Sequence, residues 1–191
     1  MKVLVATEKP FASTAVDGIR KEIENAGHEL VLLEKYTEKA QLLDAVKDVD
    51  AMIVRSDKVT PDVLDAAANL KIVVRAGAGY DSIDTAYAKE KGVIVENTPG
   101  QNANAVAELV FGMLVYAVRS FYNGKAGTEL FGKKLGILAF GNVGRNVARI
   151  AKGFGMDVYA YDAYCPKEAI EKEGVKAVAD QNELFKTCDI V

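Results

Sequence analysis

The sequence has 191 residues, half of them apolar, with 24 Lys and Arg against 27 Asp and Glu and a net charge of −3. That balance is typical of one or two soluble globular domains and excludes an intrinsically disordered chain. The scattered charges form no basic patch for nucleic acid or an anionic membrane, and no apolar run is long enough to cross a bilayer.

The first half of the chain alternates short apolar runs with amphipathic stretches of helical length, which is typical of parallel βα units. Five strands are predicted at Val3–Thr7, Glu29–Leu33, Ala51–Val54, Lys71–Arg75 and Val93–Val95. Four helices are predicted between them at Ser13–Ala26, Thr37–Lys47, from Thr60-Pro61-Asp62 onward, and Asp81–Lys91. A block of this size is large enough to bury its own core.

A segment of another kind follows, with apolar residues at three- and four-residue spacings from Asn104 to Tyr122. This spacing predicts one long amphipathic helix that is apolar nearly all round. We expect it to be a buried connector or packing element between two βα blocks and not a membrane anchor, with Gly112 and Tyr116 at packing positions.

The second block restarts the βα pattern. Strands are predicted at Leu135–Phe140, Asp157–Tyr161 and Val175–Val178, with the opening of a further strand at Asp189–Val191. Helices are predicted at Arg145–Phe154, Pro166–Glu173 and Gln181–Thr187, and a turn at Gly141–Gly144.

The turn at Ala139-Phe140-Gly141-Asn142-Val143-Gly144 carries the main chemical signal. It follows a predicted strand and opens a predicted helix, as the Gly-x-Gly-x-x-Gly fingerprint of dinucleotide binding requires, although Ala139 replaces the first glycine. Gly141 is expected to let the backbone approach a pyrophosphate at the helix N-terminus, and Gly144 to allow close packing of helix on strand.

Asp162 ends the next predicted strand, where a carboxylate can accept hydrogen bonds from ribose hydroxyls. The same carboxylate would repel a 2′-phosphate, so NAD is preferred over NADP. The alternative is a tight βα turn with no ligand, in which Asp162 caps the loop after its strand.

The first block supplies candidates for anion binding. Arg55 and Ser56 follow a predicted strand, where open α/β sheets bind ligands, and a guanidinium can hold a carboxylate or phosphate bidentately. The loop Ala76-Gly77-Ala78-Gly79 can present backbone N–H groups to an anion. The alternatives are a surface arginine paired with a nearby acid and a tight turn without a ligand.

The cysteines and the histidine indicate no further chemistry. Cys165 and Cys188 support neither a disulfide framework nor a zinc site, so we expect no metal site and a reducing, cytoplasmic compartment. His28 is the only histidine, and it lies between a predicted helix end and a strand start with no metal or nucleophile partner nearby. We interpret it as a loop residue without a catalytic role.

Several stretches together resemble the D-2-hydroxyacid dehydrogenase family, and within it the members that oxidise D-3-phosphoglycerate. They are Val54-Arg55-Ser56, Val74–Asp84, Asn97–Gly100 with Ala105–Leu109, and Leu135–Gly144 with Arg145 and Asp162. The resemblance implies an α/β protein with a flavodoxin-like substrate-binding domain over residues 1–100. A long connecting helix over 101–125 and the first part of a Rossmann NAD-binding domain over 126–191 would follow, with substrate and NAD meeting in the cleft between the domains.

The same resemblance implies roles for individual residues. Substrate-side positions fall on Arg55, Ser56, Ala76, Gly77, Gly79 and Asn102. Cofactor positions fall on Ala78, Val106, Gly141, Asn142, Val143, Gly144 and Asp162, with Val106 against the nicotinamide. The implied partners are NAD, a small 2-hydroxy or 2-oxo acid, and a second copy of the chain in a homodimer.

The family's catalytic Arg, Glu and His match no position in this sequence, so we expect them downstream of Val191 and expect the 191-residue chain to be inactive by itself. His28 belongs to the other domain and cannot replace the catalytic histidine. Two alternatives stay open. One is a relative acting on glyoxylate, hydroxypyruvate or D-lactate, and the other is a catalytically silent module that binds NAD or a partner.

Overall fold

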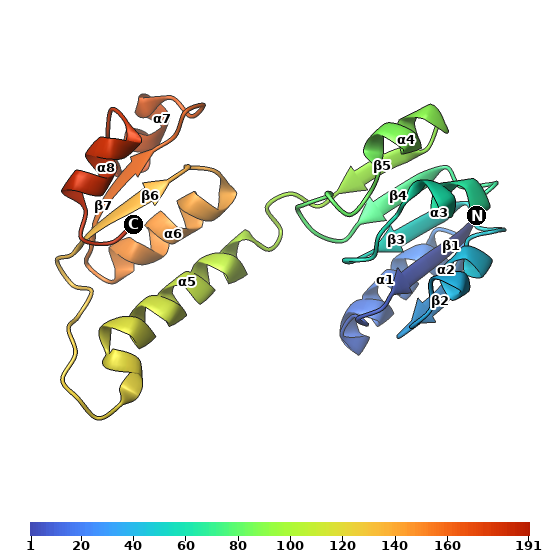
Figure 1. Ribbon diagram of the computed structural model, residues 1–191, viewed down its shortest axis with the longest axis horizontal. Coiled ribbons are helices and arrows are strands. Elements are labelled where there is room, and N and C mark those ends of the chain that lie inside the picture. The colour runs from blue at the N-terminus through green and yellow to red at the C-terminus, as the bar shows by residue number, and fades with distance from the viewer. The chain divides into compact units, whose positions relative to one another are not determined.

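The structure is a computed structural model that describes residues 1–191. It comprises two compact units, Met1–Pro99 and Gly100–Val191. Each unit is an α/β layer structure built on one parallel sheet (Figure 1). The predicted α/β fold class is therefore confirmed.

The first unit holds a five-stranded sheet in the order β2-β1-β3-β4-β5. Its strands are β1 (Lys2–Thr7), β2 (Glu29–Glu34), β3 (Ala51–Val54), β4 (Ile72–Arg75) and β5 (Ile94–Asn97). Its helices are α1 (Ser13–Asn25), α2 (Lys39–Ala45), α3 (Pro61–Ala66) and α4 (Thr85–Glu90). This strand order is that of flavodoxin-like folds, whose order reverses between β1 and β3.

The core of this unit explains why its strands read as continuous apolar runs. Leu4, Val5 and Ala6 of β1 are completely buried, as is Met52 of β3, because helices cover both faces of a parallel sheet. The edge strand β5 is different, since Ile94 keeps 59% of its surface exposed. The predicted helix from Asp81 begins later, at Thr85, because the Asp84 side chain caps α4 by accepting the Tyr87 N–H at 2.9 Å.

The second unit has a three-stranded parallel sheet in the order β6-β7-β8. Its strands are β6 (Lys134–Leu138), β7 (Asp157–Tyr161) and β8 (Lys176–Ala177). Its helices are α5 (Ala103–Val118), α6 (Asn142–Gly153), α7 (Lys167–Lys172) and α8 (Gln181–Thr187), with a 3₁₀ turn η1 (Ser120–Tyr122). The predicted strand opening at Asp189–Val191 is a single parallel bridge, in which Ile190 lies beside Leu135 of β6.

Three predicted boundaries in this unit are wrong. The helix predicted from Arg145 begins at Asn142, because Gly141 is its N-cap, so most of the turn predicted at Gly141–Gly144 is the first turn of the helix. The strand predicted to Phe140 ends at Leu138, because Ala139 adopts a left-handed φ of 82° that no strand can hold. The helix predicted to Tyr122 ends at Val118, after which Ser120–Tyr122 all have φ between 52° and 55°. The chain then turns back, and the Thr128 N–H caps the free Val118 carbonyl at 2.8 Å.

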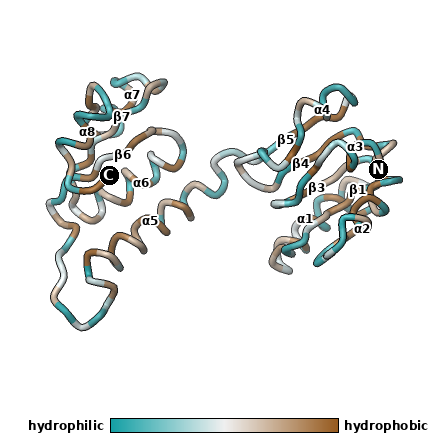
Figure 2. The backbone as a smooth tube through the Cα atoms, in the orientation of Figure 1, coloured by the Kyte–Doolittle hydropathy of each residue, from teal (hydrophilic) through white to brown (hydrophobic).

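The helix α5 is apolar along most of its length (Figure 2). Only one side is buried within its unit, through Ala103, Ala107 and Phe111, and Phe111 stacks on Phe154 at 5.0 Å between ring centroids. The expectation of a buried connector or packing element is confirmed for this side, and the opposite side of α5 is exposed within the unit. Gly112 is exposed and a Cβ atom added to it would meet open space, and Tyr116 is 46% exposed, so neither residue is a packing position within this unit.

Candidate functional site

Arg55 and Ser56 directly follow β3, at the carboxyl edge of the first sheet. The strand order of this sheet reverses between β1 and β3. Ligands of doubly wound sheets bind at such a point, beside the carboxyl ends of the strands. Both residues are exposed, and the Arg55 guanidinium lies 3.3 Å from the Pro10 carbonyl oxygen and 3.5 Å from that of Lys9. No carboxylate pairs with Arg55, so the alternative of a surface ion pair does not hold.

The loop Ala76–Gly79 follows the neighbouring strand β4. Its first two N–H groups are already used, because Ala76 donates to Val54 and Gly77 donates to Arg75, both at 2.8 Å. The N–H groups of Ala78 and Gly79 have no partner within the chain. The loop itself is held in place by Asn97, whose side-chain amide donates to the Ala78 carbonyl at 2.6 Å. Two of the four predicted donors are thus available to an anion.

Arg75 is a candidate that the sequence reasoning missed. It ends β4 in register with Val54, one residue before Arg55. Its side chain lies over Gly77, where a Cβ atom would overlap the guanidinium, and its Nε is buried without a hydrogen-bond partner. The residue was visible in the Arg-Ala-Gly-x-Gly segment, but only the fold places its guanidinium on the strand next to Arg55.

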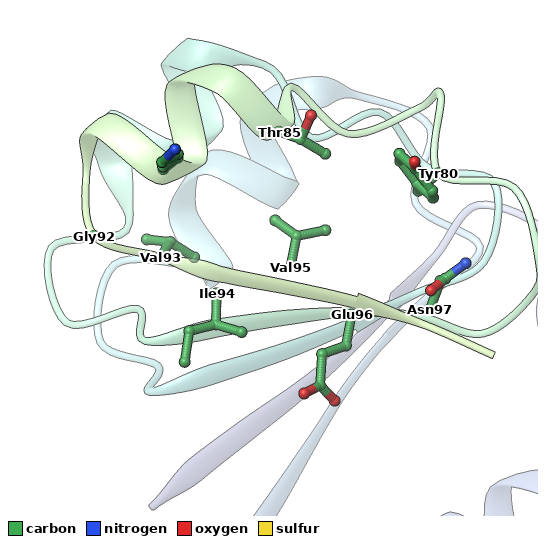
Figure 3. A pocket seen from close by; sticks show the side chains of 9 residues that line it. Tyr80, Thr85, Gly92, Val93, Ile94, Val95, Glu96 and Asn97 are labelled. Atoms are coloured by element: carbon green, nitrogen blue, oxygen red, sulfur yellow. The ribbon is translucent and has the colours of Figure 1, made fainter. Parts of the chain in front are cut away.

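A hollow of the first unit lies elsewhere. It has a volume of about 590 Å³ and runs along the unpaired edge strand β5 beneath α4 (Figure 3). Val93 and Val95 point toward the helix, whereas Ile94 and Glu96 point to the opposite face of the strand (Figure 3). The hollow contains no predicted site residue, so we assign it no part in the candidate site.

The glycine turn of the second unit has the geometry of an anion site. Gly141 is the N-cap of α6, and Asn142 and Val143 form the first turn, with no side chain capping the helix. A Cβ atom on Gly141 would meet open space, whereas one on Gly144 would overlap the Ala139 carbonyl oxygen. Gly141 therefore leaves room for a ligand, and Gly144 lets α6 approach β6.

Asp162 closes the same region from the end of β7. Its Oδ2 accepts the Phe140 N–H at 2.6 Å, and its Oδ1 accepts the N–H groups of Tyr164 and Cys165 at 2.7 and 2.9 Å. These hydrogen bonds from Tyr164, Cys165 and Phe140 hold the pKa of the Asp162 carboxyl below its usual value. The carboxylate thus caps its loop and is also ionised and partly exposed beside the turn.

Asn102 and Val106 lie at the start of α5, near the glycine turn. Asn102 is the N-cap of the helix but makes no capping hydrogen bond with its side chain, and Val106 is 38% exposed one turn later. The Asn142 side chain lies against Gly100, where a Cβ atom would come within 2.9 Å of its amide nitrogen. The beginning of α5 and the turn before α6 therefore share one surface within the second unit.

His28 and Cys188 are not part of either group of candidate site residues, whereas Cys165 lies beside Asp162 through its N–H group. His28 is at the amino end of β2, with Nδ1 at 3.4 Å from the Met1 amino group. Cys165 and Cys188 are free thiols that are partly buried. No group of three or more His, Cys, Asp or Glu side chains is placed to hold a metal ion, and no helix is long and apolar enough to span a membrane.

Comparison with known proteins decides the family. Residues 6–187 match the model for the catalytic domain of D-isomer specific 2-hydroxyacid dehydrogenases. The chain belongs to this family. The resemblance drawn from the sequence motifs is therefore confirmed, as is the Rossmann-like α/β fold that it implied.

Three relatives show what share of a family member's length the chain covers. D-3-phosphoglycerate dehydrogenase of Methanocaldococcus jannaschii is 42% identical over 167 residues, covering 80% of this chain and 32% of that protein. Hydroxypyruvate reductase of Thermotoga maritima is 42% identical over 177 residues, covering 85% of this chain and 56% of that protein. The NAD⁺-bound crystal structure of 3-phosphoglycerate dehydrogenase from Entamoeba histolytica matches with a TM-score of 0.89 and 45% identity. The match covers 100% of this chain and 61% of that protein chain. The chain spans less than two thirds of each of these relatives.

Proposed function

We propose that these residues form part of an NAD-dependent D-3-phosphoglycerate dehydrogenase, which oxidises D-3-phosphoglycerate to 3-phosphohydroxypyruvate at the entry to serine biosynthesis. One observation carries the choice of substrate. The neighbouring strands β3 and β4 bring Arg55 and Arg75 to the same sheet edge, and neither guanidinium is in an ion pair. Two unpaired guanidinium groups suit a substrate with both a carboxylate and a phosphate, since guanidinium binds each bidentately.

The second unit fits NAD. The uncapped first turn of α6 offers N–H groups to a pyrophosphate, and the open space beside Gly141 leaves room for it. Asp162 is proposed to accept the adenosine ribose hydroxyls and Val106 to lie against the nicotinamide. When bound, the cofactor accepts a hydride at nicotinamide C4.

In the first unit, we assign the substrate's charges to particular groups of this chain. Arg75 is assigned to the phosphate and Arg55 to the carboxylate, and Ser56 adds a hydroxyl donor. The N–H groups of Ala78 and Gly79 complete the anion site, and Ala76 and Gly77 border it. Asn102 belongs to the second unit, and we propose it as a further substrate-side polar residue. The general acid/base is assigned to a part of the protein outside these residues, because His28 lies at the amino end of β2.

A substrate panel on the full-length protein tests the proposal. With NAD⁺, D-3-phosphoglycerate is expected to have the highest kcat/KM, ahead of D-glycerate and D-lactate. Arg75→Gln is expected to raise the KM for D-3-phosphoglycerate more than that for D-glycerate, since only the former carries a phosphate. Turnover of another acid but not of D-3-phosphoglycerate overturns the choice.

Hydroxypyruvate reduction is the second candidate, because the Thermotoga maritima hydroxypyruvate reductase is as similar to the chain as the first relative, at 42% identity. The two functions differ in the need for a phosphate site. If Arg75→Gln leaves all KM values unchanged and hydroxypyruvate is the best substrate, the second candidate replaces the first.

We also propose a cytoplasmic homodimer formed through α5. Leu109, Met113 and Tyr116 form one stripe of that helix and are 62%, 56% and 46% exposed, an arrangement that favours burial against a second copy. Analytical ultracentrifugation of the full-length protein is expected to show a dimer, and Leu109→Arg a monomer. A monomeric wild-type protein contradicts the proposal.

A further inference from the structure

Asp57 is a buried carboxylate next to the proposed anion-binding pair Arg55 and Ser56. Only 4% of its surface is exposed, although the residues on both sides of it are exposed. A carboxylate is costly to bury unless hydrogen-bond donors surround it. No motif in the sequence indicated a role for this residue.

The donors around Asp57 come from three different segments. Its Oδ1 accepts the Glu8 N–H at 2.7 Å and the Tyr36 hydroxyl at 2.8 Å. Its Oδ2 accepts the N–H groups of Arg55 and Ser56, both at 3.3 Å. Glu8, Tyr36 and Arg55 follow β1, β2 and β3, so one carboxylate joins the loops after three adjacent strands.

We propose that Asp57 is a positioning residue, which holds the backbone of Arg55 and Ser56 so that the guanidinium and hydroxyl face the substrate's acidic groups. The inference rests on the proposed function, since it assigns those two residues to the substrate. The Tyr36 phenol reinforces the arrangement, because its burial, together with the nearby Asp57 carboxylate, raises its pKa and keeps it a donor.

Because Asp57 is negatively charged, the direction in which its removal changes the substrate KM tests the proposal. If the residue acted only through its electric field, a negative charge near the anion site would weaken substrate binding, and its removal would lower KM. If it acts by holding the loop, removal frees Arg55 and Ser56 and raises KM. The amide of an asparagine would also turn an N–H donor toward N–H groups that now donate to a carboxylate.

The test compares Asp57→Asn with Asp50→Asn in the full-length enzyme. Asp50 precedes the same strand at its amino end, where it accepts the Lys2 N–H at 2.8 Å and pairs with Lys71 at 2.7 Å. Asp57→Asn is expected to raise the KM for D-3-phosphoglycerate by about tenfold or more, with kcat and the KM for NAD⁺ within about threefold of wild type. Asp50→Asn is expected to lower stability without changing either KM.

An unchanged or lowered substrate KM in Asp57→Asn overturns the inference while the proposed function stands. If Asp57→Asn does not fold, Tyr36→Phe removes one hydrogen bond from the same carboxylate and is expected to raise the substrate KM by about twofold to threefold, and no rise overturns the inference. If the wild-type enzyme turns over no 2-hydroxy acid, the proposed function fails. Amide hydrogen exchange at Arg55 and Ser56 then tests whether Asp57 holds this loop. Faster exchange in Asp57→Asn but not in Asp50→Asn supports the positioning role, and equal exchange in the two variants refutes it.

Discussion

The backbone N–H of Phe140 donates a 2.6 Å hydrogen bond to Asp162 and so joins the glycine turn after β6 to the end of β7. The other oxygen of the carboxylate holds the loop that follows β7. Asp162 therefore has two roles in our account, since it fixes the shape of the turn and is proposed to bind the ribose.

Asp162→Asn is expected to weaken NAD binding by tenfold or more, because hydrogen bonds to a charged group are each worth about 1.5–3 kcal/mol. It is also expected to narrow the preference for NAD over NADP. Calorimetric titration with each cofactor measures both effects. Asp157→Asn is the matched control at the amino end of the same strand, where Asp157 pairs with Lys176 at 3.2 Å, and it is expected to leave both affinities unchanged.

The lowered pKa of Asp162 predicts a pH dependence of stability. A carboxyl whose pKa is lower in the folded than in the unfolded chain adds stability that is fully present above its ordinary value of 3.8. That stability is lost as the pH falls from this value toward the lower folded pKa. Urea unfolding from pH 7 to pH 3 is expected to show wild type and Asp162→Asn converging in stability below about pH 4. A constant difference across this range contradicts the prediction.

The two glycines of the turn are expected to respond differently to the same change. Gly144→Ala forces a methyl group against the Ala139 carbonyl and is expected to destabilise the protein by about 1–3 kcal/mol. Gly141→Ala meets open space, so it should preserve stability but place its methyl group where the pyrophosphate is proposed to bind. Thermal unfolding with and without NAD separates the two outcomes, and Gly141→Ala with wild-type NAD affinity would show that the ligand binds elsewhere.

Ala139 occupies the first glycine position of the fingerprint with a φ of 82°. Left-handed backbone costs a residue with a Cβ about 1–2 kcal/mol, which exceeds the entropic cost of glycine in most contexts. Ala139→Gly is therefore expected to stabilise the protein by up to about 1 kcal/mol. Urea denaturation checks this, with Ala148→Gly in the middle of α6 as the control that should destabilise.

Thr7 ends β1 with its hydroxyl completely buried and without a hydrogen-bond partner. A buried, unsatisfied polar group costs about 1–3 kcal/mol, so Thr7→Val is expected to stabilise the protein by about 1 kcal/mol. Thr7→Ser keeps the hydroxyl, loses a buried methyl group and should destabilise. If Thr7→Val is the less stable of the two variants, the hydroxyl has a role that its contacts do not reveal.

The parts of the fold that depend on local pattern could be predicted. Strands such as Ala51–Val54 are short apolar runs between turn signals, and both sheets follow from their alternation with helices. The misplaced boundaries depend on details that the apolar pattern does not show, such as the φ of Ala139 and the contact in which Thr128 caps Val118. Arg75 and Asp57 were missed because a single arginine or aspartate in a sequence does not indicate a site. Their proposed roles depend on groups that the fold brings close to them from other loops.

The two ends of the first sheet differ in a way that has practical value. At the carboxyl ends lie Arg55, Ser56 and the Ala76–Gly79 loop, whereas near the amino ends Lys2 pairs with Asp48 and Lys71 with Asp50, at 2.6 and 2.7 Å. An affinity handle or fluorophore attached near Asp48 would hold this unit by the edge that carries no candidate ligand group. Surface-immobilised binding measurements could then be made with the arginine edge facing the solution.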